Sequence, residues 1–219
     1  KWYLGMGLTS EMVAKEYNIS RKDQDEFAVN SVEKAINAID SGFFKDQIVP
    51  IKVKENYYED GKTKEREYEL KMDEGPRRGT TVEGLSKLKP AFAADGTSTA
   101  GNSSQMSDGA AFVLVVSEKA LKEYNLTPIA RLVDYQVAGV EPYKMGIGPI
   151  EAIPKVLKHA NMKMEEIDLF ELNEAFASQS LAVIRELGLE KNKVNVNGGA
   201  IALGHPLGAT GAKLTVQIL

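Results

Sequence analysis

The sequence predicts an α/β fold, layered around a substantially parallel sheet. Two observations favour this class. Residues 110–116 form a continuous apolar run, which is typical of a strand covered on both faces. From residue 130 onward, segments with strand-like and helix-like patterns alternate, and this is the order that parallel β-α-β units require.

The first predicted element is a long helix that begins after Ser20. Asp23 follows three residues later, in the pattern of a capping box. Apolar residues then recur at helical spacing over residues 28–39, and Ser41-Gly42 is expected to end the helix.

A hairpin is predicted next. Residues 48–53 are expected to form an edge strand because they include Pro50, which cannot donate a backbone hydrogen bond. A turn at Asp60-Gly61 leads back into a second strand near residues 68–71. The charges of residues 62–69 alternate in sign, so we interpret them as a solvated surface of the hairpin.

The second half of the chain is expected to alternate between strands and helices. Strands are predicted at residues 110–116, 130–140, 167–172 and 193–196, and helices at 154–160, at 174–187 and from 209 onward. Gly188 is expected to end the second of these helices. The change of composition places a division of the chain between residues 106 and 128.

Composition excludes several classes of function. Lys+Arg 27 against Asp+Glu 31 gives a net charge of -4 without a basic patch, so no nucleic-acid partner is expected. No apolar run approaches the ~20 residues that a membrane span needs. The chain has no cysteine, so it carries no disulfide, thiolate metal site or cysteine nucleophile. Its 2 histidines exclude a histidine-rich metal site.

The densest motif is the glycine-rich segment 195–211, which holds His205 between Gly204 and Pro206. No Gly-Lys-Ser/Thr step follows, so the segment is not a phosphate loop. His205 lies after a predicted strand and before a predicted helix, where α/β folds place catalytic side chains. The alternative interpretation is a structural turn with an incidental histidine.

Asn173 lies at another strand-to-helix junction and has two interpretations. It suits a helix N-cap, with Glu174 in the first turn, and it is equally able to present its amide to a ligand. Residues 99–109 are small and polar, as in an ordinary loop. His159 lies near the end of an amphipathic helix and is interpreted as a surface residue.

Taken together, these motifs resemble the thiolase family, and the resemblance extends along essentially the whole chain. The segments that carry it are Asn173–Ala177, Asn197–Gly211, Thr99–Ala111, Gly5–Thr9, residues 85–92 and residues 145–149. The amino-acid sequence of residues 102–108 is most similar to that of the degradative 3-ketoacyl-CoA thiolases.

The resemblance implies a layered α-β-α-β-α fold, of which this chain is only a part. Residues 1–106 would form a loop domain that covers coenzyme A. Residues 107–127 would be the last strand and helix of the N-terminal catalytic half, and residues 128–219 a truncated C-terminal half. The whole protein is expected to form a homodimer or homotetramer. We interpret the sequence as an internal or C-terminal piece, and we expect a cytoplasmic location.

The same resemblance implies roles for individual residues. His205 would be the base that activates a cysteine, and Asn173 would help to bind the enolate oxygen. The residues expected to contact coenzyme A are Met6, Arg77, Phe92, Ala100, Ser104, Met145 and Phe176. Coenzyme A and acyl-CoA would be substrates, and no cofactor or metal is expected.

Two departures from the family pattern limit this analogy. Members of the family use a nucleophilic cysteine and a second cysteine as acid and base. Both are missing here, so the chain alone is expected to be inactive, and Gly5 stands where many members carry a histidine. A biosynthetic acetoacetyl-CoA thiolase and a non-catalytic protein that binds acyl-CoA or lipid remain as alternatives to thiolytic cleavage of 3-ketoacyl-CoA.

Overall fold

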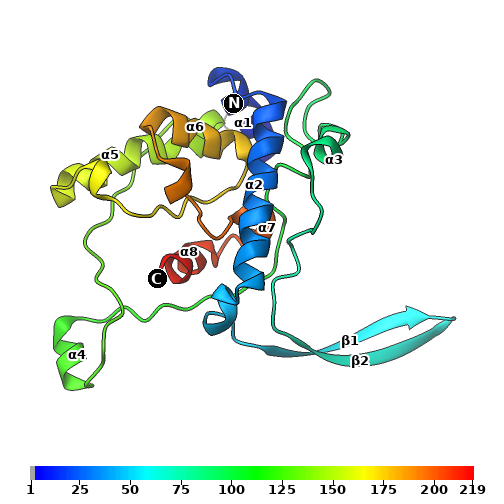
Figure 1. Ribbon diagram of the computed structural model, residues 1–219, viewed down its shortest axis with the longest axis horizontal. Coiled ribbons are helices and arrows are strands. Elements are labelled where there is room, and N and C mark those ends of the chain that lie inside the picture. The colour runs from blue at the N-terminus through cyan, green and yellow to red at the C-terminus, as the bar shows by residue number, and fades with distance from the viewer. Residues whose placement is uncertain (1–2) are drawn as a thin grey trace.

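A computed structural model describes residues 3–219 and shows a body of packed helices with a protruding hairpin (Figure 1). The α-helices are α1 (Met6–Glu16), α2 (Arg21–Asp40), α3 (Val82–Ser86), α4 (Glu118–Glu123), α5 (Gly148–Ala160), α6 (Ala177–Leu187), α7 (Ala200–Leu203) and α8 (Thr210–Ile218). Short 3-10 helices are η1 (Phe43–Asp46), η2 (Pro142–Ile147), η3 (Met164–Glu166) and η4 (Lys191–Lys193). The strands of the hairpin are β1 (Ile51–Glu59) and β2 (Lys62–Leu70).

The prediction of the long N-terminal helix is confirmed. Ser20 is the N-cap of α2, and its hydroxyl accepts a hydrogen bond from the backbone N–H of Asp23 at 3.1 Å. The Asp23 carboxylate accepts in return from the backbone N–H of Ser20, which completes the capping box. Gly42 follows the helix with a φ of 77°, in the left-handed region.

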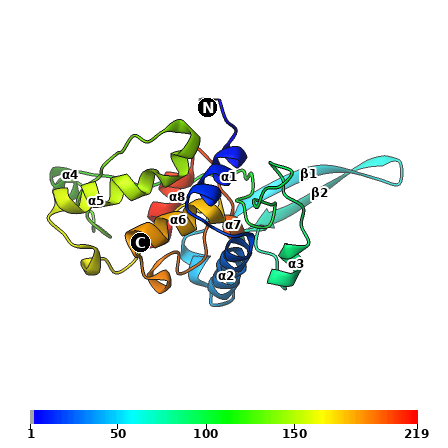
Figure 2. The same ribbon diagram turned by 90° about the horizontal axis from the view of Figure 1, so that it is seen from above.

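The predicted hairpin is also confirmed, and its strands are longer than expected. Asp60 and Gly61 have φ angles of 53° and 74°, as a two-residue turn between right-handed twisted strands requires. Figures 1 and 2 both show the hairpin projecting away from the helices. Its charged side chains pair across the strands, for example Arg66 with Glu55, and face solvent as predicted.

Helix α6 forms the centre of the helical body. All residues from Ala177 to Ile184 are buried, because α1, α2 and α5 pack around this helix. One apolar cluster joins α2 to α7 through Val32, Ala35 and Leu203. These two helices therefore hold the segment that precedes His205 against the body.

Two helices begin elsewhere than predicted. Helix α6 begins at Ala177 and not at residue 174, because residues 174–176 pair with the loop around Ser103. Gly188 ends it in the left-handed region, as predicted. Helix α5 begins at Gly148 and not at residue 154. Pro149 stands in its first turn, where a missing N–H is tolerated, and Pro154 is accommodated inside the helix.

The predicted strands of the second half are wrong as elements of this structure. Residues 110–116 and 130–140 form no regular secondary structure and pair with no strand among residues 3–219. The predicted strands 167–172 and 193–196 are reduced to one parallel bridge, between Phe170 and Val194. A strand is defined by its neighbours, and the described residues supply none for residues 110–116 and 130–140 and only this one bridge for the other two segments.

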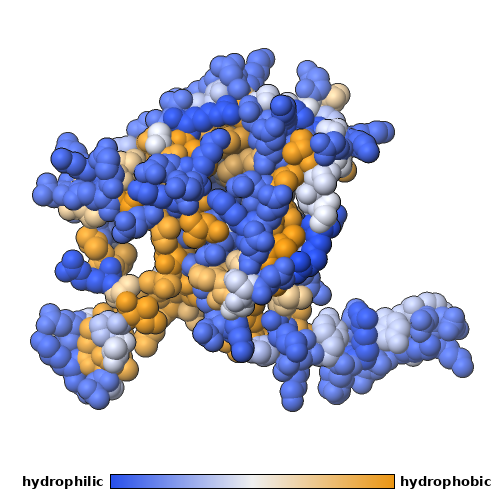
Figure 3. All heavy atoms as spheres, viewed as in Figure 1, coloured by the Kyte–Doolittle hydropathy of each residue, from blue (hydrophilic) through white to orange (hydrophobic). Residues whose placement is uncertain are grey.

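The unpaired segment exposes apolar side chains. Phe112, Leu114 and Val115 are 90%, 78% and 74% exposed. In Figure 3, apolar spheres continue along the region between α4 and the main body. An extended, apolar and unpaired backbone is a template for association with another chain. No helix within residues 3–219 is long and apolar enough to span a membrane.

We therefore expect the purified chain to self-associate through residues 110–116. Leu114→Glu should reduce the apparent mass measured by multi-angle light scattering at high protein concentration, because a charge on this segment opposes edge pairing. Val49 is 81% exposed outside the segment, so Val49→Glu is the matched control and should not change the mass. A wild-type chain that stays monodisperse and monomeric would contradict the prediction.

Candidate active site

His205 lies in the turn between α7 and α8. A helix follows it as predicted, but the element before it is the helix α7 and not a strand. Gly204, which precedes it, has a φ of 86° and a ψ of 162°, a backbone conformation accessible essentially only to glycine. A Cβ atom on Gly204 would also lie 2.2 Å from the Ser107 hydroxyl oxygen. The backbone N–H of His205 donates to the carbonyl of Gln105 at 3.3 Å. The conformation of Gly204 and the hydrogen bond to Gln105 together fix this turn.

The hydrogen bonds of the imidazole define its tautomer. The Thr210 hydroxyl donates its single proton to the carbonyl oxygen of Pro206 at 3.0 Å. It must therefore accept from Nδ1 of His205, which lies 2.6 Å from Thr210 Oγ1. This leaves Nε2 without a proton. Its lone pair points away from Thr210 and is able to act as a base.

The surroundings of His205 keep the ring neutral. Burial lowers the pKa of the imidazole, and the positive charge of Lys213 on α8 lowers this pKa further. A neutral imidazole with an unprotonated Nε2 is able to take a proton, whereas an imidazolium is not.

Asn173 faces this basic nitrogen. Its Nδ2 lies 3.3 Å from Nε2 of His205, so the sequence-based candidates come together across 32 residues of chain. Its Oδ1 is buried and has no hydrogen-bond partner among residues 3–219. The interpretation of Asn173 as a helix N-cap is wrong, because α6 begins at Ala177 and its N-cap is Phe176.

Gln179 positions the segment that carries Asn173, and the sequence analysis missed it. Its Nε2 donates to the Asn173 carbonyl at 3.0 Å, and its Oε1 accepts from the backbone N–H of Phe176 at 3.1 Å. The side chain thereby closes the turn in front of α6. No signal in the sequence indicated this role, because Gln179 lies inside the helix predicted at 174–187, and only the later start of α6 at Ala177 places it in the first turn.

Glu174 is a buried residue that connects the site to α2. It is 1% exposed, and its carboxylate accepts from Ser31 Oγ at 2.6 Å, Asn195 Nδ2 at 2.8 Å and the backbone N–H of Ile201 at 3.2 Å. Burial raises the pKa of Glu174, and these hydrogen bonds oppose that rise. One carboxylate therefore connects α2 with both segments that carry the candidate residues.

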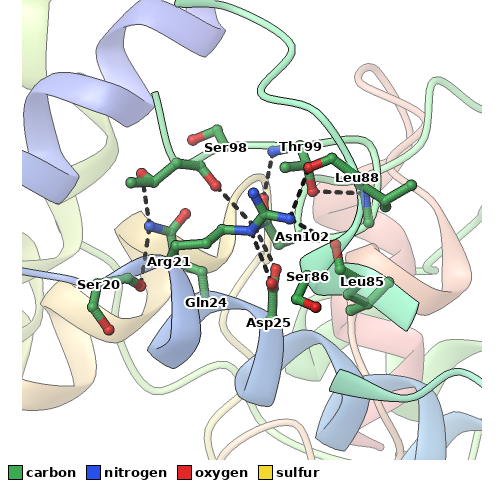
Figure 4. A network of polar contacts seen from close by, with 12 residues as sticks. Ser20, Arg21, Gln24, Asp25, Leu85, Ser86, Leu88, Ser98, Thr99 and Asn102 are labelled. Atoms are coloured by element: carbon green, nitrogen blue, oxygen red, sulfur yellow. Dashed lines mark hydrogen bonds and ion pairs between the residues drawn. The ribbon is translucent and has the colours of Figure 1, made fainter. Parts of the chain in front are cut away.

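The loop of residues 97–106 joins the two segments from the other side. The backbone N–H of Ser104 donates to the Ala175 carbonyl at 2.9 Å, and Met106 forms a parallel bridge with His205. Figure 4 shows how the loop is held to α2. Asn102 is fully buried and donates through Nδ2 to Asp25 Oδ1 at 2.9 Å. Neither Asn102 nor Asp25 was among the residues predicted from the sequence.

Four of the residues expected to contact coenzyme A lie around one region beside Asn173. The rings of Phe92 and Phe176 meet edge to face, with centroids 5.9 Å apart. Phe92 also lies against Gly7, the neighbour of Met6 in α1. Met145 precedes Gly146, which contacts the side chain of Gln179. Met6 and Met145 are about half exposed, so these apolar side chains line a surface open to solvent.

The other expected contacts are distributed differently. Ser104 is half-buried within the loop of residues 97–106. Ala100 is exposed at the turn of this loop. Arg77 is exposed between β2 and α3. His159 is exposed and pairs with Asp134, which confirms its interpretation as a surface residue.

An open cleft of about 410 Å³ adjoins the histidine turn. Residues 107–111 form one wall, and residues 206–209 form the other. The wall of residues 107–111 begins the unpaired segment described above. The cleft therefore brings the turn of His205 to a surface that another polypeptide segment is able to reach.

The sequence matches the family described as Thiolase, N-terminal domain over residues 3–119, and the family described as Thiolase, C-terminal domain over residues 126–219. The chain belongs to the thiolase family, and its homologues are acyltransferases of that class. The division into residues 1–106, 107–127 and 128–219 stays a prediction.

Individual relatives support this assignment. A 3-ketoacyl-CoA thiolase of Bacillus subtilis (strain 168) is 53% identical over 100% of this chain and 56% of its own length. The peroxisomal 3-ketoacyl-CoA thiolase of Saccharomyces cerevisiae is 50% identical over 100% of this chain and 50% of its own length. The chain thus spans about half the length of these relatives.

Solved structures confirm the fold class. The Bacillus anthracis acetyl-CoA acetyltransferase superimposes with a TM-score of 0.91 at 49% identity, over 97% of this chain and 52% of that one. The human mitochondrial 3-ketoacyl-CoA thiolase gives a TM-score of 0.87 at 44% identity, over 98% of this chain and 52% of that one. The prediction of a partial thiolase-like α/β fold is therefore confirmed.

A second carboxyl group, Glu171, lies near Glu174 and titrates abnormally. Burial raises its pKa from 4.5 to about 7, and the charge of Glu174 adds to this rise. Its Oε2 is buried without a hydrogen-bond partner among residues 3–219. The folded state therefore retains this proton to a higher pH than the unfolded chain. The associated stability is fully present below pH 4.5 and is lost as the pH rises to about 7.

We expect Glu171→Gln to raise the melting temperature at pH 8 more than at pH 5, because glutamine cannot lose a proton. Calorimetry or circular dichroism across this range measures the difference. Glu165 is exposed in η3, so Glu165→Gln is the control and should not alter the pH dependence. Equal effects of both substitutions would show that Glu171 titrates normally.

Proposed function

We propose that this chain supplies the histidine and asparagine side of the active site of a thiolase that cleaves 3-ketoacyl-CoA. The observation that carries the proposal is the contact of Nε2 of His205 with Nδ2 of Asn173 at 3.3 Å, on a ring whose Nδ1 is bonded to Thr210 at 2.6 Å. A histidine in a purely structural turn needs neither a defined tautomer nor a buried amide opposite its free nitrogen. The names of the relatives support the choice of reaction class.

The reaction needs a cysteine that this sequence does not contain. An ordinary thiol has a pKa of ~8.5, so it requires a base to react at neutral pH. Nε2 of His205 would take the thiol proton, and the thiolate would attack the 3-keto carbon. The C2–C3 bond would then break, and its electron pair would form the enolate of acetyl-CoA, which takes up a proton. The shortened acyl group would stay on the cysteine as a thioester, and attack by the thiol of coenzyme A would release it as the shortened acyl-CoA and return the cysteine.

Asn173 and the newly charged His205 would stabilise that enolate. Nδ2 of Asn173 and the proton on Nε2 are donors on the same side of the site, where a thioester oxygen gains negative charge. A donor fixed in advance contributes about 3–4 kcal/mol to such a step. The unpartnered Oδ1 of Asn173 remains available to accept from a water molecule.

The apolar surface near Asn173 suits the pantetheine arm and acyl chain of the substrate. Met6 and Met145 are flexible apolar side chains, and Phe176 with Phe92 supplies a rigid wall. We propose that Arg77 meets the phosphates of coenzyme A, because it is an exposed cation on a net-negative chain. Ser104 and the backbone of Ala100 would contact the pantetheine amides.

The remaining expectations concern assembly and location. A solved yeast relative is described as the dimeric peroxisomal thiolase, which supports a homodimer for the whole protein and leaves a tetramer as the alternative. A cytoplasmic location stays our proposal beside that peroxisomal relative.

The chain alone should not cleave 3-ketoacyl-CoA, because covalent catalysis requires the missing thiol. Loss of acetoacetyl-CoA in the presence of coenzyme A, followed by absorbance, measures this directly. Turnover by the purified chain would overturn the proposed mechanism.

Catalysis by His205 is tested in a chimera. The matching half of the Bacillus subtilis relative is replaced by this chain, and thiolytic cleavage of C4 and longer 3-ketoacyl-CoA substrates is measured. His205→Asn should lower kcat by ~10²–10³ with little change in KM, since a base and an oxyanion donor are lost together.

The control for this experiment is His159→Asn, which alters the exposed histidine and should leave both kinetic constants unchanged. If the two variants behave alike in an active chimera, His205 is a structural turn residue. An inactive chimera whose melting curve is normal would contradict the proposed function itself.

A further inference from the structure

Lys213, like Thr210, is a residue of α8 that contacts the histidine turn. It follows Thr210 by three residues, so the two side chains share one face of the helix. Thr210 binds Nδ1 of His205 at 2.6 Å, and Nζ of Lys213 donates to the Gly204 carbonyl at 3.1 Å. One helical face therefore holds both the imidazole and the peptide group that precedes it.

The environment of Lys213 is unfavourable for a charge. The side chain is half-buried, and burial lowers the pKa of its ammonium group. No carboxylate oxygen lies within 4.0 Å of its nitrogen among the residues that the structure describes. A methionine or leucine would cover the same apolar surface without the cost of desolvation. Packing and ion pairing therefore do not account for a lysine at this position.

Three carboxyl groups face Lys213 from other elements without touching it. Glu171 and Glu174 precede α6, and Asp73 follows β2, and each raises the pKa of the ammonium. The segment of Asp73 is pressed against α7, since a Cβ on Gly75 would lie 2.4 Å from the Ala202 carbonyl oxygen. Their charges oppose the effect of burial without contacting the ammonium group, so its hydrogens are free to donate to the Gly204 carbonyl.

We propose that Lys213 is a positioning residue for His205: its hydrogen bond fixes the Gly204 peptide and, with it, the imidazole. Its positive charge also opposes protonation of the ring. This inference rests on the proposed role of His205 as a base, but its structural part is independent of activity. The other groups around the ring, Asn173 and Thr210, are uncharged. Lys213 is therefore the charge that acts on the imidazole from the elements packed against it.

The experiment uses nuclear magnetic resonance of the two imidazole rings in the chain itself. Long-range ¹H–¹⁵N spectra report the tautomer and the pKa of each histidine, and His159 is an internal reference. Lys213→Met removes charge and donor, Lys213→Gln retains a donor without charge, and Lys213→Arg retains both. Lys193 donates to the Ile167 carbonyl at 3.3 Å, so Lys193→Met is the matched control.

We expect Lys213→Met to raise the pKa of His205 by ~0.3 or more and to mix its tautomers. Lys213→Gln should raise the pKa but keep the Nδ1–H tautomer, and Lys213→Arg should preserve both. Lys193→Met should change neither property, and His159 should be unaffected throughout.

The proposal is overturned if the His205 pKa is the same in the Gln and Arg variants, a comparison that stands even if the Met variant does not fold. In the active chimera, Lys213→Met should also lower kcat, leave KM nearly unchanged and shift the acidic limb of the pH profile upward. An inactive chimera would count against the proposed function, whereas the imidazole titration would still decide the role of Lys213.

Discussion

The structure depends above all on the buried hydrogen bond between Asp25 and Asn102. Both side chains are almost completely withdrawn from solvent, and Asp25 is held in turn by Arg21. Removing either partner would leave a buried polar group unsatisfied, at a cost of about 1–3 kcal/mol. Because the loop of residues 97–106 continues from Asn102 to the backbone of His205, this bond also determines where the histidine turn rests.

Elements with local signals were predictable from the sequence. The capping box at Ser20, the Asp60-Gly61 turn and the stop at Gly188 each act within a few residues, so the pattern alone defines the conformation. The strand at residues 110–116 was not predictable in this way. Its apolar run is typical of a strand covered on both faces, but pairing and burial depend on neighbours that residues 3–219 do not supply, and the segment is exposed here.

In the candidate site, too, some residues were predictable from the sequence and others were not. His205 and Asn173 were identifiable because each stands at a junction between a predicted strand and a predicted helix. The residues that orient them were not identified, since Gln179, Thr210 and Lys213 act on backbone groups or ring nitrogens whose position only the folded chain defines. Their residue types are ordinary in helices, so the sequence offers no pattern that distinguishes them from surface positions.

The hydrogen bond between Ser31 and Glu174 has a consequence for folding. It closes a loop of 143 residues, and the bond between Ser10 and Ser178 closes one of 168. Contacts at such separations form only after most of the loop-closure entropy has been lost, which slows folding. Helix α2 and the hairpin, whose contacts are local, are able to form early. The hydrogen bond between Ser31 and Glu174, which connects the histidine turn to α2, therefore forms only late in folding.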